Sequence, residues 1–127
     1  MRSVTVTRKK KLAGAIMPYW VITRVGKAEF CSEHGLEGDM CEQSSNGFPV
    51  PRIDMSILDG IGTRISSGET VSIELNEGDK SLFVSTVDGC LSNEVSLEDF
   101  WETGLKITVT TKGGFMTLPH PVVELPE

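Results

Sequence analysis

The chain has 127 residues, of which 39% are hydrophobic and 24% are charged, so it is long enough for one domain with a core and unlike a disordered chain. Its formal net charge of −6 argues against nucleic acid as a general partner, because binding a phosphate backbone needs a basic surface. It contains no run of 18 apolar residues, so the sequence predicts no transmembrane segment.

The N-terminal region carries most of the positive charge, with seven Lys or Arg and one acid in residues 1–30. The alternation in "SVTVT" predicts a half-buried strand with Val4 and Val6 on one face. We interpret "RKKK" at residues 8–11 as the solvated end of that strand, with a phosphate or anionic-lipid contact as the alternative. Because Pro18 interrupts the apolar run that follows, the sequence does not predict a signal peptide, and we expect a cytoplasmic protein, with export as the alternative.

Residues 19–51 begin with a strand-like pattern of apolar residues, which ends near residue 31. "YWVITRV" at residues 19–25 predicts a strand, and "AEFC" at residues 28–31 predicts a shorter one. Residues 31–51 show no periodicity and contain three Gly and two Pro, which predicts an irregular loop insertion. Loops of this length inside a compact domain are often functional or cross-linked.

Regular alternation returns after residue 52. "IDMSIL" predicts a strand that ends at an Asp59-Gly60 hairpin turn, and "IGTRI" predicts the strand that follows. Gly68 predicts the next turn, and "TVSIEL" predicts a strand whose apolar residues face inward. "SLFVSTV" and "NEVSL" extend the same pattern to residue 97.

The C-terminal region holds the only piece that is predicted to be helical. "SLEDFWETG" predicts one short helical turn, with Ser96 as its cap. "LKITVTT" then predicts a strand, and the proline-flanked "PHPVVELPE" predicts an edge strand. The whole chain therefore reads as one domain, residues 1–127. We predict an all-β antiparallel β-sandwich of eight or nine short strands, with one short helical turn and the insertion at residues 31–51.

The turn pattern carries a family resemblance. "LDG", "SSGET", "IELNEGDKSLFV" and "LSNEVSL", together with the basic first strand "VTVTRKKK", resemble small bacterial β-sandwich modules of the PEGA-like kind. The resemblance covers roughly residues 53–97 and the first strand. It implies a non-catalytic accessory or interaction domain, with no active-site residues to assign.

Cys31, His34 and Cys41 form the sharpest chemical cluster, inside the irregular insertion. Thiolate and imidazole are ligands that zinc prefers, and the Cys-x2-His spacing lets two ligands meet one ion, so the cluster predicts a structural zinc site. The alternatives are a Cys31–Cys41 disulfide in an exported protein and plain thiols. A closed zinc site needs a fourth ligand, for which the candidates are Cys90, His120 and Asp39.

Aromatic residues and strand edges offer the other candidate binding features. Tyr19, Trp20 and Trp101 would form a sugar or peptide platform if they gathered on an exposed face. The N-terminal strand or the C-terminal "VVEL" would be able to pair with a partner strand if either lay unprotected at an edge, which would give a homodimer.

These observations favour a non-catalytic binding or protein-interaction module with an unknown protein or small ligand as its partner. A small metalloprotein with a structural zinc site is the second hypothesis, and a hydrolytic enzyme is the third. Apart from this zinc, we expect no cofactor. The sequence contains no nucleophile elbow and no phosphate-binding loop.

Overall fold

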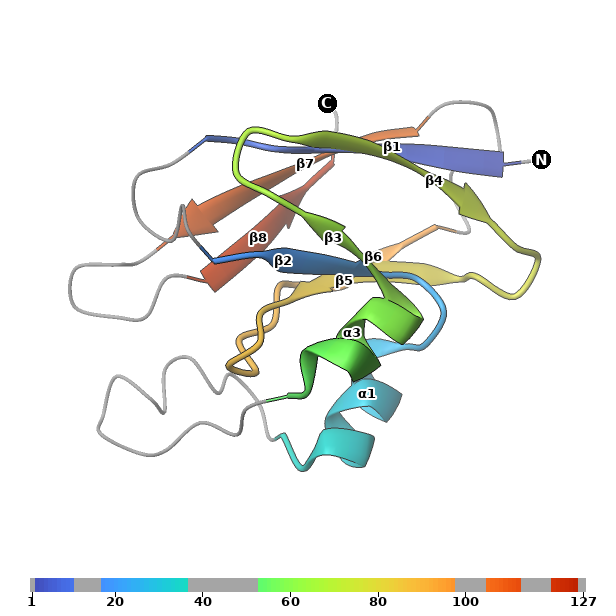
Figure 1. Cartoon of the computed structure of the whole chain (residues 1–127). Coiled ribbons are helices and arrows are strands. Elements are labelled where there is room, and N and C mark those ends of the chain that lie inside the picture. The colour runs from blue at the N-terminus through green and yellow to red at the C-terminus, as the bar shows by residue number, and fades with distance from the viewer. Residues whose placement is uncertain (1, 11–16, 37–52, 98–104, 113–119, 126–127) are drawn as a thin grey trace.

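The computed structural model describes residues 2–10, 17–36, 53–97, 105–112 and 120–125. In this part of the chain, eight strands form two four-stranded sheets that face each other in a sandwich-like arrangement, and two short helices lie beside the second sheet (Figure 1). The predicted β-rich, two-sheet architecture is therefore confirmed, but some of its details are not.

The first sheet contains the N-terminal and C-terminal strands. Its strand order is β4-β1-β7-β8, and the strands are β1 (Arg2–Arg8), β4 (Thr70–Leu75), β7 (Leu105–Lys112) and β8 (His120–Glu124). β1 pairs antiparallel with β4 but parallel with β7, so the prediction of a wholly antiparallel fold is wrong for this sheet. Parallel neighbours need a long connection, and here the connection between β1 and β7 includes the entire second sheet.

The second sheet is antiparallel throughout. Its strand order is β3-β2-β5-β6, and the strands are β2 (Tyr19–Ile22), β3 (Gly62–Ile65), β5 (Ser81–Ser85) and β6 (Val95–Ser96). All four residues of β2 are buried, because the strand is covered on both faces. Tyr19 and Val21 face the core between the sheets, whereas Trp20 and Ile22 face a second core under the helices.

The helices are α1 (Lys27–His34) and α3 (Met55–Ile61), and both lie on the side of the second sheet that faces away from the first (Figure 1). The prediction of a strand at residues 28–31 is wrong, because α1 occupies these residues and buries Phe30 against the second sheet. Gly35 ends α1 in the left-handed conformation, with φ of 66°, which glycine adopts without a steric penalty.

The predicted strand in "IDMSIL" and its hairpin turn are also wrong, because α3 occupies both. Asp54 caps the helix by accepting a hydrogen bond from the backbone N–H of Ser56 at 2.8 Å. The apparent alternation was a coincidence of composition, since Met55 and Ile57 are each 46% exposed and Leu58 is the buried contact. Ser96, the predicted cap of a helical turn at residues 96–104, lies in β6 instead, and residues 98–104 lie outside the described residues. The predicted irregular insertion at residues 31–51 is wrong for residues 31–34, which belong to α1, and its residues 37–51 lie outside the described residues.

Arg8 departs from the predicted solvated strand end. Its side chain is 1% exposed, and it donates hydrogen bonds to the carbonyls of Met17 and Ile65 at 2.8 and 3.0 Å. The guanidinium carbon lies 3.6 Å from the centroid of the Tyr19 ring, a cation–π contact between the sheets. Burial lowers the pKa of this guanidinium. The first of the four basic residues is therefore a core residue, whereas the two lysines after it are exposed.

Candidate interaction surface

The outer side of β4 is an open strand edge. The backbone N–H of Arg8 donates to the carbonyl of Glu69 at 2.9 Å, which makes these two residues a hydrogen-bonded pair of the β1–β4 ladder. Hydrogen-bonded pairs alternate in an antiparallel ladder. The N–H and C=O groups of Thr70, Ser72 and Glu74 therefore point away from β1. No strand within the described ranges pairs with them.

The side chains of β4 add a half-covered apolar stripe to this edge. Val71 and Ile73 face the core but remain partly exposed, because no further strand covers them in the described part of the fold. The residues that alternate with them, at positions 70, 72 and 74, are exposed on the opposite face. The strand contains neither Lys nor Pro, two residues that commonly protect sheet edges.

A small recess opens beside this edge. It has a cavity volume of about 80 Å³ and lies between β4, β3, the end of β2 and α3. Ile73 and Glu74 form its β4 side. The hydroxyl and charged groups that line the rest of it come from Thr23, Arg24, Asp59 and Thr63.

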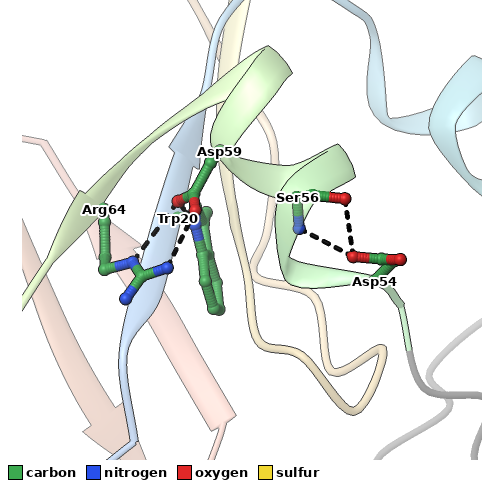
Figure 2. A network of polar contacts seen from close by, with 5 residues as sticks. All are labelled: Trp20, Asp54, Ser56, Asp59 and Arg64. Atoms are coloured by element: carbon green, nitrogen blue, oxygen red, sulfur yellow. Dashed lines mark hydrogen bonds and ion pairs between the residues drawn. The ribbon is translucent and has the colours of Figure 1, made fainter.

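A polar network fixes the α3 wall of the recess (Figure 2). Asp59 accepts a hydrogen bond from the indole N–H of Trp20 at 2.8 Å, and its other carboxylate oxygen lies 2.9 Å from a guanidinium nitrogen of Arg64. The hydrogen bond from Trp20, followed by that from Arg64, lowers the pKa of the Asp59 carboxyl. The network joins one side chain each from β2, α3 and β3, and so holds the helix against the sheet.

The opposite edge of the same sheet is closed. The carbonyl of Val109 accepts a hydrogen bond from the N–H of Lys9, so the backbone groups of Val109 point toward β1. Val123 pairs with Val109 in the ladder between β7 and β8, so the N–H and C=O of Val123 point away from β7. The amide of Asn93 takes both of those groups, donating to the Val123 carbonyl at 3.0 Å and accepting from the Val123 N–H at 2.9 Å. Two residues earlier, Pro121 has no N–H to offer.

The strand order of this sheet decides which of the predicted edge strands are edges. β8 is an edge strand, as the proline-flanked "VVEL" predicted, but its outer backbone groups are occupied. β1 is an interior strand between β4 and β7, so the prediction of an N-terminal edge is wrong. The sequence did not point to β4 as the open edge, because its alternation is the same as that of an interior strand with one solvated face.

α1 carries two of the three predicted zinc ligands, Cys31 and His34. The ring of His34 contacts the ring of Phe30 in a tilted arrangement with 4.5 Å between centroids, and its Nε2 atom is buried without a hydrogen bond in the described structure. Burial raises the pKa of the Cys31 thiol, which disfavours the thiolate that a metal needs. Cys41 lies outside the described residues, within which no three such side chains cluster, so the zinc site remains a prediction.

The two cysteines in the described part of the chain, Cys31 and Cys90, differ in their bonding. Cys31 is free, so the alternative of a Cys31–Cys41 disulfide is wrong. Cys90 is disulfide-bonded and therefore unavailable as a fourth zinc ligand. His120, another candidate for that ligand, lies at the start of β8.

The predicted aromatic platform does not form from the residues that the structure places. Tyr19 and Trp20 are both fully buried, on opposite faces of β2. The hydroxyl of Tyr19 shares a hydrogen bond of 2.8 Å with that of Thr111, and burial raises the pKa of this tyrosine. Trp101 lies outside the described residues. Tyr19 and Trp20 therefore serve the cores and present no ring to a ligand.

Comparisons of the chain with protein-family models, with curated proteins and with solved structures find no match. Among the helices that the structure describes, none has the length and apolar character needed to span a membrane. The geometry of the molecule is thus the basis for a functional proposal.

Proposed function

We propose that this chain is a non-catalytic binding module that accepts an extended strand along the edge of β4. The observation that carries the proposal is the outward row of backbone groups at Thr70, Ser72 and Glu74, next to a recess. Strand addition of this kind draws its affinity from main-chain hydrogen bonds and its specificity from pockets for alternate side chains. The β4 edge offers backbone groups for the hydrogen bonds, and the recess beside Ile73 offers a pocket for a side chain.

The chemistry of the recess indicates which side chain it would accept. Its hydroxyl groups and the charges of Arg24 and Asp59 suit a short polar side chain that donates and accepts hydrogen bonds. Arg24 also donates to the carbonyl of Gly60 at 3.4 Å, a long bond that a bound group would be able to replace.

The resemblance to PEGA-like modules remains part of this proposal. Such modules are β-sandwiches with interaction roles, and two facing sheets with glycine turns are compatible with that assignment. The disulfide at Cys90 supports an oxidising compartment, so we propose export ahead of the cytoplasmic location that the sequence favoured.

The test is a library of random decapeptides displayed on phage, selected against the purified protein at low concentration. We expect selected peptides to bind the wild-type chain and to lose at least about tenfold in affinity to Ser72→Pro, because proline removes one outward N–H and its ring obstructs an added strand. Ser72→Ala is the matched control and should bind normally, since it keeps the backbone intact. Peptides whose binding is indifferent to Ser72→Pro would place the binding site elsewhere.

A further inference from the structure

We propose, building on the proposed function, that the strand added to β4 is the β4 of a second copy of this chain, antiparallel and centred on Ser72. The pair would be related by a twofold axis, so that each copy presents the same surface to the other. Three independent features of the edge support this occupant and this register.

The first feature is the backbone pattern. Centring on Ser72 places Ser72 opposite its own copy and Thr70 opposite the second copy's Glu74. All three outward-facing residues of each strand then form hydrogen-bonded pairs, about six bonds in all. A slip of one residue would turn the outward groups of one copy toward the inward groups of the other and lose the ladder.

The second feature is the apolar stripe. In the same register, Val71 of one copy lies directly opposite Ile73 of the other, on the core-facing side of the joined sheet. These are the two side chains of β4 that the first core leaves half-covered. Directly opposed side chains in the non-hydrogen-bonded pairs of an antiparallel ladder approach closely, so each would complete the burial of the other.

The third feature is charge. Beside the Thr70 end of β4, the charged residues sum to +2: Arg8, Lys9, Lys10 and Glu69. At the Leu75 end, the charged residues sum to −1: Arg2, which pairs with Leu75, and Glu74, Glu77, Asp79 and Lys80. An antiparallel pair brings the positive end of each copy to the negative end of the other, whereas a parallel pair would bring like ends together.

The first measurement is sedimentation velocity of the full chain across a range of concentrations. We expect a monomer–dimer equilibrium, and we expect Ser72→Pro to weaken it at least about tenfold while Ser72→Ala leaves it unchanged. Amide hydrogen exchange at high and low concentration adds a local readout, since protection of the N–H groups of Thr70, Ser72 and Glu74 should rise with dimerisation.

The second measurement tests the register by cross-linking in a Cys31→Ser background. Ser72→Cys should form a disulfide between copies on mild oxidation, because residues facing each other in a hydrogen-bonded pair have Cα atoms about 5.5 Å apart, within the range that disulfides span. Thr70→Cys is the matched control. It should not cross-link to itself, but it should cross-link when mixed with Glu74→Cys.

The outcomes separate this inference from the function on which it rests. A chain that stays monomeric while binding displayed peptides in a Ser72→Pro-sensitive way would overturn the second copy as occupant and leave the strand-accepting edge in place. If Ser72→Pro alters neither peptide binding nor self-association, both proposals fail. A dimer that cross-links through Thr70→Cys alone would overturn the register.

Discussion

β4 and β8 are the two edge strands of the same sheet, and they differ in what meets the backbone groups on their outer sides. On β8, the groups of Val123 are bound by the Asn93 side chain, and Pro121 lacks an N–H. On β4, the corresponding groups of three residues point away from the ladder, and no described strand receives them. Exposed edges promote unintended pairing, and proteins commonly block them. A fold that blocks one edge with a dedicated side chain and leaves the other open is consistent with use of the open one.

The largest expected effect comes from proline substitutions at two neighbouring β4 residues, which test whether the backbone of β4 alternates between groups that bond β1 and groups that point outward. Ile73→Pro should lower the free energy of unfolding by about 2–4 kcal/mol, because it removes an N–H that bonds β1. Ser72→Pro should cost about 1 kcal/mol or less, since its N–H points outward and proline is tolerated there. Urea unfolding followed by tryptophan fluorescence would measure both. Equal losses would show that the backbone groups of β4 are not arranged as we infer.

Opening the closed edge is the next largest change. Asn93→Ala leaves the N–H and C=O of Val123 without their partner and should lower the free energy of unfolding by about 1–3 kcal/mol. Asn93→Asp is the matched control, because it keeps the acceptor but not the donor, and its loss should be intermediate. With a second open edge, the alanine variant should also form assemblies larger than the wild type in sedimentation. A variant that is as stable as the wild type and no larger would mean that Asn93 does not protect β8.

The smallest expected effect is a difference in pH dependence between α3, which forms a wall of the recess beside β4, and the Asn93 contact that covers the edge of β8. Asp54, through its hydrogen bonds with Ser56, and Asp59, through Trp20 and Arg64, have pKa values lowered in the folded protein. A lowered folded pKa gives stability that is present above the unfolded value of about 3.9 and is lost as pH falls through the folded value. α3 should therefore weaken only below about pH 4, whereas the neutral Asn93 amide does not titrate.

The measurement for this difference is urea unfolding at a series of pH values from 7 to 2.5. The Asp54→Asn/Asp59→Asn double variant should show a flatter decline in stability below pH 4 than the wild type. The same decline in both proteins would assign the acid sensitivity to other carboxylates.

The sequence predicted strands correctly where apolar and polar residues alternate because one face of the strand is buried and the other is exposed. Val4 and Val6 are buried as expected, and Gly68 takes the positive φ that its turn needs. Periodicity misled at α3, because a seven-residue helix is too short to show a 3.6-residue repeat, and its capping Asp54 looked like an alternating polar residue.

The features that define the candidate surface depend on contacts that no local pattern reports. The side chain of Asn93 covers the edge of β8 by bonding the backbone of Val123, thirty positions later in the chain. Nothing in the local sequence "SNEV" indicates that partner. Which strands are edges follows from strand order, which alternation does not determine. Cys31 and His34 lie on one short helix, α1, whereas the sequence predicts an irregular loop there.

The parallel pairing of β1 with β7 also has a consequence for biosynthesis. β1 is made before β7, and its register joins Val4 to Leu105, about a hundred residues later. At translation rates of about 5–20 residues per second, the ribosome needs roughly 5–20 s to supply that partner. During this interval, β1 has at most β4 to pair with, and the side of β1 that β7 will later cover is an unpaired edge. Folding of the first sheet is therefore expected to finish only once β7 has been made, and until then β1 keeps an unpaired side on which other strands are able to add.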